Sequence, residues 1–580
     1  MDSLLGHIDG PEDLKRLALE QLPHLATEIR QALLARFEQV GGHVGPNLGV
    51  VEATIALHYV FNSPVDKIVF DVSHQCYTHK ILTGRRTAYT DPSRYLEVSG
   101  FTNPEESPHD IFSIGHSSTA TSLALGLAKA RDLQGESYEV ITFVGDGALS
   151  GGEAYEGLDN AAAYGGKFII VLNDNDMSIA PNQGGLYGHL AKLRHSKGSS
   201  SENIFKELGF DYLYVEDGHD ISALVSAFQA AREANTPIVV HIHTTKGKGH
   251  PEAEVDREAW HEIKLPQRAR PEFKRLMSSI TDQLLERMHK DPSIVLISPG
   301  TPSSQGITPE FREQAGTQFV DVGITEEHSV AFISGLARGG AKPVLAIAST
   351  FLQRTYDQLL QDLALNSSPA TILVYASGFT QREATHCGMF DIAMTSSIPN
   401  LLCLAPATQD DCLAMIDWSL DQQERPVLIR IPTTLASEGN AGAFDDKQIG
   451  RFHVVNQGAR VAIIGLGSAF SLALMARDEL SLTAGINATL INPLTYSQLD
   501  EELLFELEGE HDVVVTIESG VLDGGFGERI ARFYGTRPMR VVCMGGDKEF
   551  TERVAVTEQL ERYGLTPEAM CARILEALES

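Results

Sequence analysis

Short apolar runs rich in β-branched residues recur along the chain, and longer segments with apolar positions at helical spacing lie between them. A short continuous apolar run is typical of a parallel strand that is buried on both faces. In the first half of the chain, such strands are predicted at 68–70, 140–144, 168–172 and 238–243. Helices are predicted there at 11–39, 51–59 and 119–130. The alternation of strands and helices predicts an α/β fold with mainly parallel sheets.

The alternation continues to the C-terminus, after a predicted helix at 273–289. Further strands are predicted at 294–297, 344–347, 372–375, 461–464, 487–491 and 513–518. A chain of 580 residues is too long for one hydrophobic core, so it should divide into several domains. Two linkers are predicted, a Pro- and Arg-bearing stretch at 265–271 and a Gly-, Ala- and Ser-bearing stretch at 433–447. The predicted domains are 1–265, 272–432 and 448–580.

Composition and charge narrow the class of protein. The chain is 43% hydrophobic and 21% charged, which is typical of a globular protein. Its formal net charge of −31 argues against nucleic acid or an anionic membrane as a partner. The six cysteines are scattered without a CxxC pair, which favours reduced thiols over a zinc site. We see no signal peptide and no apolar run of membrane-spanning length, so a cytoplasmic location is expected.

Two polar turns follow neighbouring predicted strands. The sequence GDG (145–147) follows one strand, and NDND (173–176) follows the next. Ligands of open α/β sheets bind beyond the carboxyl ends of the strands, so Asp146 and Asn175 are expected to emerge close together. A carboxylate and an amide oxygen suit Mg²⁺, which shares its ligand shell with phosphates, and the glycines allow the backbone to approach a ligand closely. The alternative is a βαβ unit with ordinary turn residues.

Other polar side chains sit where a ligand could reach them. His43 stands in a Gly-rich turn, and His74, His79 and Lys80 follow the strand at 68–70 within seven residues. These side chains form either a solvated loop or the wall of a polar pocket. The segment 115–117 precedes a small-residue helix, and a helix N-terminus preceded by Gly and Ser is a ready anion site.

Together these motifs resemble a known family. HKILTGRR, SIGHSSTATS, GDGALSGGEAYEGL and VLNDNDMSI occur in the order and spacing of the 1-deoxy-D-xylulose-5-phosphate synthases, and FVDVGITEEHSVAFISGLA and STFLQRTYDQ extend the resemblance over nearly the whole chain. It implies three α/β domains, namely a thiamine diphosphate-binding fold of the transketolase type plus a transketolase C-terminal-like domain, with the active site between the first two. It also implies a homodimer that decarboxylates pyruvate and joins the two-carbon unit to an aldehyde acceptor.

The resemblance implies roles for individual residues. Asp146 and Asn175 would bind Mg²⁺ by side chain and Met177 by its carbonyl. Glu326 would hold N1′ of the aminopyrimidine as the catalytic glutamate, whereas its position alone also suits an acidic residue at a helix N-terminus. His43 and His386 would handle the proton of the acceptor. The other cofactor contacts implied are His74, Gly115, His116, Ser117, Gly145, Gly147, Ala148, His261, Phe351 and Arg354.

The chain departs from the family in the acceptor half. Ala376 and Thr433 stand where the family has two arginines that grip the phosphate of glyceraldehyde 3-phosphate, and neither side chain can replace a guanidinium fork. Either Arg382 supplies a relocated phosphate contact, or the acceptor is a different aldehyde, which we favour. The segment 181–203 is also shorter than the family's, which implies a different lid. A sugar-donor transketolase and a non-catalytic cofactor-binding protein are the remaining alternatives.

Overall fold

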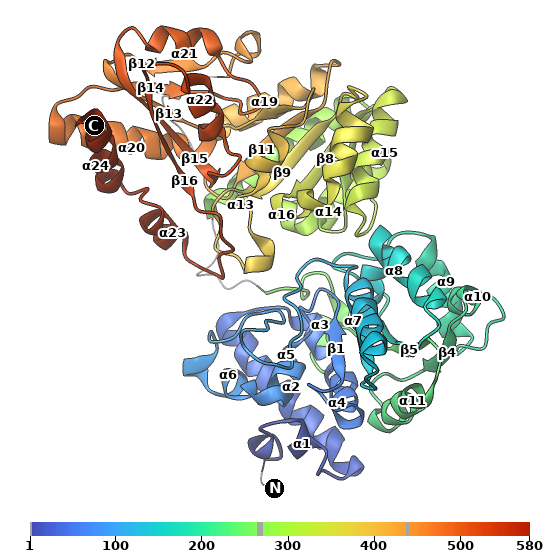
Figure 1. Cartoon of the computed structure of the whole chain (residues 1–580). Coiled ribbons are helices and arrows are strands. Elements are labelled where there is room, and N and C mark those ends of the chain that lie inside the picture. Colours follow the sequence, from blue (N-terminus) through green and yellow to red (C-terminus); the bar gives the residue numbers. More distant parts are fainter. Residues whose placement is uncertain (1–2, 264–270, 437–440, 443, 580) are drawn as a thin grey trace. The chain divides into compact units, whose positions relative to one another are not determined.

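A computed structural model of the chain describes residues 3–263, 271–436, 441–442 and 444–579 (Figure 1). The described chain forms two compact units. The first contains the residues up to 263 together with 323–325, and the second contains the remainder. Among the described residues, no helix is both long enough and apolar enough to cross a membrane.

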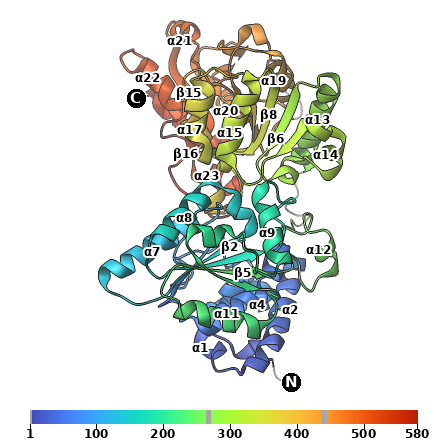
Figure 2. The same ribbon diagram turned by 90° about the vertical axis from the view of Figure 1, so that its right-hand side faces the viewer.

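The first unit is built on one five-stranded parallel sheet with the strand order β1-β2-β3-β5-β4 (Figure 2). Its strands are β1 (Lys67–Phe70), β2 (Val140–Gly145), β3 (Ile169–Asp174), β4 (Asp211–Val215) and β5 (Ile238–His243). The side chains of β2 and β3 are buried on both faces, which explains why these strands read as continuous apolar runs.

Helices cover both faces of this sheet. One face packs against α2 (Leu22–Val40), α4 (Val51–Val60) and α11 (Ile221–Glu233). The other face packs against α7 (Ala120–Gln134), α8 (Gly152–Ala163) and α9 (Gly185–His195). Shorter helices complete the unit, namely α1 (Pro11–Leu14), α3 (Val44–Leu48), α5 (Tyr77–Lys80), α6 (Thr87–Thr90), α10 (Ile204–Leu208) and α12 (Pro251–Val255). The loops that carry the polar motifs lie at the carboxyl ends of the strands.

The helix predicted at 11–39 is not continuous. The chain forms α1, then a 3₁₀ turn at Leu19–Gln21, and only then the long helix α2. Pro23 lies in the first turn of α2. A proline has no N–H to donate and fits the start of a helix better than its interior, so it marks a new helix start rather than the middle of a longer helix.

The second unit contains two sheets. The first has the order β10-β11-β9-β8-β6-β7 and is entirely parallel. Its strands are β6 (Ile294–Ser298), β7 (Phe319–Asp321), β8 (Lys342–Ala348), β9 (Thr371–Ser377), β10 (Leu402–Leu404) and β11 (Val427–Pro432). The second has the order β12-β14-β13-β15-β16, and only β12 runs antiparallel to its neighbour. Its strands are β12 (His453–Asn456), β13 (Arg460–Gly465), β14 (Thr489–Asn492), β15 (His511–Val521) and β16 (Arg540–Gly546).

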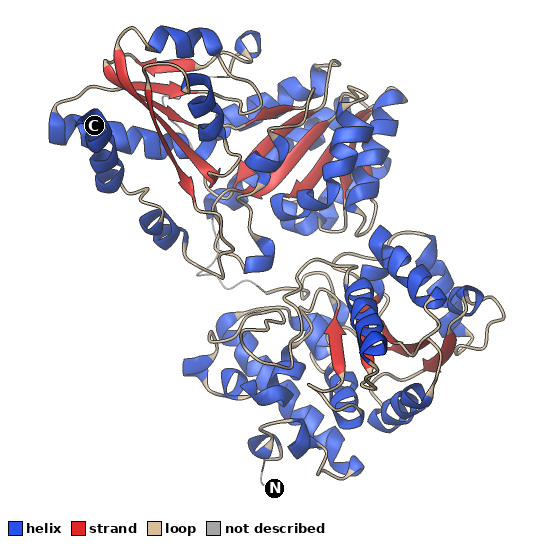
Figure 3. Ribbon diagram, in the orientation of Figure 1, coloured by secondary structure: helices blue, strands red, loops and turns tan. Residues whose placement is uncertain are grey.

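Helices flank these sheets as well (Figure 3). The longer ones are α13 (Pro271–Lys290), α14 (Pro309–Ala315), α15 (Glu326–Arg338), α19 (Gln409–Asp421), α20 (Phe470–Ala484), α21 (Glu501–Leu507), α22 (Phe526–Tyr534), α23 (Val556–Arg562) and α24 (Pro567–Glu579). The shorter ones are α16 (Ser349–Leu352), α17 (Tyr356–Gln358) and α18 (Asp391–Thr395). One apolar core contains side chains of both sheets, such as Ile347 and Ile464, so the two sheets belong to one unit.

The predicted fold class is confirmed, because all three sheets are parallel apart from the edge strand β12. Each of the three predicted domain ranges holds one sheet, but the boundaries themselves stay predictions. Of the predicted linkers, 265–271 lies outside the described residues except for Pro271, and 433–447 is described only in part.

Candidate cofactor and active site

The two polar turns of the first unit meet at the carboxyl ends of β2 and β3. The strands pair in register up to Gly145 and Asn173, so the residues that follow emerge side by side. The backbone N–H of Met177 donates to Oδ2 of Asp146 at 3.2 Å. Asp146 is only 1% exposed, and its burial, together with the nearby charge of Asp174, raises its pKa to about 7. The structure thus places a buried carboxylate with a raised pKa beside the residues that follow the second strand.

These residues fit a hard cation. Oδ1 of Asn175 is buried and accepts no hydrogen bond from the described residues, so it can act as a ligand without losing a partner. A carboxylate, an amide oxygen and a carbonyl form the oxygen set that Mg²⁺ takes while it shares its remaining positions with phosphates. The described residues contain no cluster of three or more His, Cys, Asp or Glu suited to a metal. The predicted set has only one such residue, Asp146.

Gly147 is needed for a close approach within the protein. A Cβ at this position would lie 2.6 Å from Cβ of Ser178, which immediately follows Met177. The glycine therefore lets the two turns touch, whereas around Gly145 no atom lies within 4 Å of an added Cβ. Ala148 follows in the short 3₁₀ helix Asp146–Ser150.

Lys246 is a site residue to which the sequence pattern assigned no role. Its ammonium group is buried and donates to the carbonyl of Ser178 at 2.5 Å. Burial lowers the pKa of Lys246 to about 7, while the charge of Asp146 opposes that shift. A buried cation beside the two turns is suited to an anionic ligand. The KGKGH motif (246–250) could have drawn attention to Lys246, but the spacing of its residues does not indicate where this side chain points.

The start of α7 is already capped. The carboxylate of Asp71 accepts hydrogen bonds from the backbone N–H groups of Ser118 and Ala120, at 2.8 and 3.0 Å. Those two amides are therefore not available to a phosphate, and the anion-site interpretation of this helix start loses part of its basis. Gly115, His116 and Ser117 lie in the loop just before it, and their contacts with the cofactor stay predictions.

Three predicted histidines form one cluster in the first unit. The ring centre of His74 lies 5.1 Å from that of His43 and 5.3 Å from that of His261. The ring centres of His43 and His261 lie 5.7 Å apart. Backbone pairing explains how residues so distant in sequence meet. Gly42 and Ile263 form an antiparallel bridge, and the N–H of Gly45 donates to the carbonyl of Trp260 at 2.8 Å.

His79 and Lys80 fit neither interpretation offered for their segment. Both are fully buried in α5, away from solvent. His79 lies 2.8 Å from Asp110, and Lys80 lies 2.6 Å from Glu106. Arg85 joins both carboxylates, at 2.7 Å to Asp110 and 3.2 Å to Glu106. These residues form a buried ion-pair network, so among the polar side chains that follow β1 only His74 lies in the histidine cluster.

Glu326 occupies a buried position at the start of α15 in the second unit. Its side chain is 2% exposed, and Oε2 accepts no hydrogen bond from the described residues. Burial raises the pKa of Glu326 to about 7, although the guanidinium group of Arg354 opposes the shift. Arg354 lies 3.8 Å from the neighbouring Glu327. A carboxyl group with a free oxygen and a raised pKa is suited to exchange a proton with a bound heterocycle.

Two further predicted residues meet in the same unit. The rings of Phe351 and His386 pack edge to face with centres 5.8 Å apart. Thr385 Oγ1 lies 2.8 Å from Nδ1 of His386, which orients the imidazole. Phe351 belongs to α16, which follows β8. The edge-to-face contact sets the aromatic ring beside the imidazole rather than in an isolated core position.

The two departures from the family lie on neighbouring strands. Ala376 lies near the carboxyl end of β9 and Thr433 follows the end of β11, and these strands pair with Tyr375 opposite Ile431. Ala376 has a left-handed backbone, with φ of 55°. An added Cβ at Gly388 would lie 2.2 Å from the Ala376 carbonyl oxygen, so the loop from 378 to 388 returns tightly onto this strand end. Arg382 lies in that loop, and its carbonyl accepts from the N–H of Arg553 at 2.7 Å.

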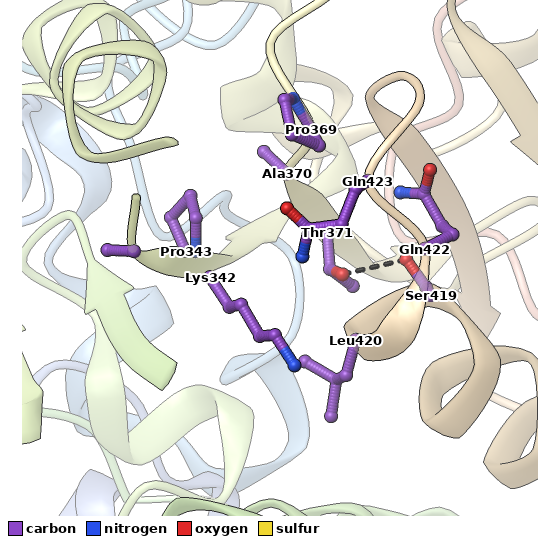
Figure 4. Close-up of a pocket in the computed structure, with 10 residues that line it drawn as sticks. Lys342, Pro343, Pro369, Ala370, Thr371, Ser419, Leu420, Gln422 and Gln423 are labelled. Carbon is purple, nitrogen blue, oxygen red and sulfur yellow. Dashed lines mark hydrogen bonds between the residues drawn. The ribbon is translucent and has the colours of Figure 1, made fainter. Parts of the chain in front are cut away.

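A pocket in the second unit lies away from these residues. It is lined by the starts of β8 and β9 and the end of α19, where Thr371 and Ser419 hydrogen-bond at 2.7 Å (Figure 4). Its lining includes Lys342, which pairs with Asp291 at 3.0 Å. The pocket is at the amino ends of the strands, whereas ligands of such sheets bind at the carboxyl ends. We assign it no chemistry.

Comparison with known proteins gives the family. The model of the 1-deoxy-D-xylulose-5-phosphate synthase N-terminal region matches residues 5–201 and 194–244. The transketolase pyrimidine-binding domain matches 276–438, and the transketolase C-terminal domain matches 450–570. Among solved structures, a transketolase mutant from Pichia stipitis is 16% identical over 97% of this chain and 98% of its own, with a TM-score of 0.46.

Curated relatives match over nearly the full length. The 1-deoxy-D-xylulose-5-phosphate synthase of Symbiobacterium thermophilum is 40% identical over 98% of this chain and 94% of its own. That of Brevibacillus brevis is 37% identical over 98% of both chains. That of Carboxydothermus hydrogenoformans is 36% identical over the whole of both chains. The chain therefore belongs to the 1-deoxy-D-xylulose-5-phosphate synthase family, whose members depend on thiamine diphosphate and a divalent metal.

Proposed function

We propose that the chain is a transferase that decarboxylates pyruvate and joins the remaining two-carbon unit to an aldehyde. The observation that carries this proposal is the buried oxygen cluster at the ends of β2 and β3, in a chain that matches the family over its full length. Asp146, Asn175 and the carbonyl of Met177 would hold Mg²⁺, and Lys246 would balance charge on the diphosphate. When bound, thiamine diphosphate supplies the electron sink that decarboxylation needs.

The protein's own groups orient the reactants and move protons. The buried carboxyl of Glu326 would hydrogen-bond N1′ of the aminopyrimidine, and its raised pKa suits a group that must share a proton near neutral pH. Phe351 would stack on that ring, and Arg354 would keep the local charge balanced. The histidines at 43, 74 and 261 would line the reacting region and exclude bulk water. His386, oriented by Thr385, would steady the proton of the acceptor.

A second candidate concerns the acceptor. Ala376 and Thr433 lie at the carboxyl ends of adjacent strands, where both side chains are uncharged. Neither side chain offers a phosphate the guanidinium fork that binds phosphate oxygens in pairs. We therefore propose an aldehyde other than glyceraldehyde 3-phosphate as the preferred acceptor. Arg382, in the loop that returns onto Ala376, is the residue that would bind a phosphate if the usual acceptor is retained.

The acceptor prediction is tested by pyruvate-dependent CO₂ release with a panel of aldehydes, phosphorylated and unphosphorylated. We expect an unphosphorylated aldehyde to give a kcat/KM at least as high as glyceraldehyde 3-phosphate. A strong preference for the phosphorylated triose contradicts the altered acceptor, and Arg382→Ala then shows whether that arginine binds the phosphate. Ketose cleavage without CO₂ release would instead indicate a sugar-donor transketolase, and the absence of any turnover a cofactor-binding protein.

Assembly as a homodimer and a cytoplasmic location belong to the proposal as well. Membership of the family supports both, and the described residues add no contact that bears on either. Sedimentation velocity of the purified protein with Mg²⁺ and thiamine diphosphate tests the dimer. A monomer that turns over pyruvate at full rate would refute it.

A further inference from the structure

The segment that follows the NDND turn contacts both strand ends that carry the proposed metal site. Nδ2 of Asn182 donates to Oδ2 of Asp146 at 2.6 Å. The hydroxyl of Tyr187, in α9, donates to the carbonyls of Asp146 and Gly147 at 3.3 and 3.4 Å. This is the stretch whose shortness predicted a different lid. In the structure it contains α9, and Asn182 and Tyr187 bind it to the GDG turn.

Arg194, in the last turn of α9, fastens the other strand end. Its Nη1 donates to both oxygens of Asp174 at 2.7 and 2.6 Å, and its Nη2 lies 2.8 Å from Oδ1 of Asp176. Asp174 is fully buried, and Arg194 is only 12% exposed. One guanidinium group therefore binds the residues on both sides of Asn175. A planar fork with several donors can do this, whereas a point charge cannot.

The turn that Arg194 holds would be unfavourable without it. Asp176 has a left-handed backbone with φ of 57°, a conformation that non-glycine residues seldom adopt. Asp174 also places a second carboxylate near that of Asp146, and like charges at short range repel. Oδ2 of Asp174 also lies 2.9 Å from Nε2 of His241, and His241 is in turn 2.8 Å from the hydroxyl of Tyr212. Asp174 is thus fixed from two sides.

We propose that Arg194 is a positioning residue for the metal site. By binding Asp174 and Asp176 together, it fixes the backbone that carries Asn175 and leads to Met177, whose N–H donates to the Asp146 carboxylate. Arg194 contributes no ligand itself, because a guanidinium group has no acceptor. Asn182, just before α9, and Tyr187, in α9, hold the GDG turn in the same way, so the segment 182–194 links the two halves of the site. This inference rests on the proposed use of Mg²⁺ and thiamine diphosphate.

The experiment measures metal affinity without turnover. Mg²⁺ is titrated calorimetrically into full-length protein at saturating thiamine diphosphate, for the wild type, Arg194→Met, Arg194→Lys and Lys192→Met. Loss of a residue that orients metal ligands typically weakens metal binding by about 10–100-fold, and we expect Arg194→Met to fall in that range. Arg194→Lys should recover part of the affinity, because it keeps the charge but reaches one carboxylate only. Lys192→Met is the matched control on the same helix, since Lys192 is exposed and pairs with the exposed Glu202.

A second readout separates positioning from general damage to the fold. At saturating Mg²⁺ we expect Arg194→Met to keep its binding stoichiometry and a kcat within about threefold of the wild type, because excess metal refills a weakened site. Unchanged Mg²⁺ affinity in Arg194→Met, with wild-type protein that binds normally, overturns the inference. Wild-type protein that binds neither Mg²⁺ nor thiamine diphosphate overturns the proposed function instead. If Arg194→Met does not fold, Arg194→Lys and Asn182→Ala decide, and normal affinity in both refutes the role of the segment 182–194.

Discussion

Glu326→Gln should lower kcat by roughly 10³-fold and leave the cofactor bound. Glutamine has the shape of glutamate but cannot exchange a proton with the aminopyrimidine, and a positioned acid or base contributes about 10²–10⁴ to a rate. Since Glu326 is buried with one oxygen unpaired, a neutral side chain of the same size should cause no loss of stability. The measurement is steady-state CO₂ release from pyruvate, with thiamine diphosphate binding followed separately by calorimetry.

The matched control is Glu327→Gln, the adjacent and partly exposed carboxylate. It should turn over within a few-fold of the wild type. Equal losses of kcat in the two variants would mean that turnover depends on the negative charge at this helix start and not on proton exchange by Glu326. Normal turnover by Glu326→Gln would remove Glu326 from the mechanism altogether.

Glu326→Gln should also change how the thermal stability of the protein depends on pH. Folding raises the pKa of Glu326 from 4.5 to about 7 through burial. Below pH 4.5 the group is protonated in both the folded and the unfolded state and costs nothing. Between pH 4.5 and 7 the unfolded state ionises first, so this group makes the wild type lose stability as the pH rises. The Tm of Glu326→Gln minus that of the wild type should therefore increase from pH 5 to pH 7.5, and a constant difference would contradict the raised pKa.

Asp146→Asn is expected to abolish cofactor binding and, with it, activity. Loss of an orienting partner lowers metal affinity by roughly 10–100-fold, and loss of a metal ligand should lower it further. A ligand that binds only the folded state stabilises it, by about 2.7 kcal/mol at a concentration of 100 times Kd. We therefore expect the wild-type Tm to rise when Mg²⁺ and thiamine diphosphate are added together, and the Tm of Asp146→Asn to stay unchanged.

The control for this prediction is Asp159→Asn, an exposed carboxylate on α8, the helix that follows the GDG motif. It should keep the full thermal shift. A full shift in Asp146→Asn as well would place the metal elsewhere. A shift with thiamine diphosphate alone, without Mg²⁺, would show that the cofactor binds independently of the metal.

Several features of this protein could be predicted from the sequence because they are local. Buried parallel strands are apolar on both faces, so β2 and β3 were visible as short runs, and the turns after them were predicted to share one sheet edge. The pairing of β2 with β3 confirms that Asp146 and Asn175 follow neighbouring strands. The family was likewise identified from ordered motifs, because each motif is a short contiguous stretch.

Other features depend on which distant segments pack together, and no local pattern carries that information. His43 meets His261 because Gly42 pairs with Ile263, and Ala376 shares an edge with Thr433 because β9 pairs with β11. The burial of His79 and Lys80 follows from partners some thirty positions away, which turn two polar residues of an expected loop into members of an ion-pair network.

The shorter segment after the NDND turn shows the same limit. Its length alone predicted a different lid, which stays a prediction, and the structure shows that the segment contains α9, whose Arg194 binds both aspartates beside Asn175. The sequence by itself determined the fold class, many of the strands and helices, the family and the cofactor chemistry, because these are encoded in periodicity and contiguous motifs. The tertiary structure decided how each ligand is held, because long-range pairing is selected by the packing free energy of the whole unit.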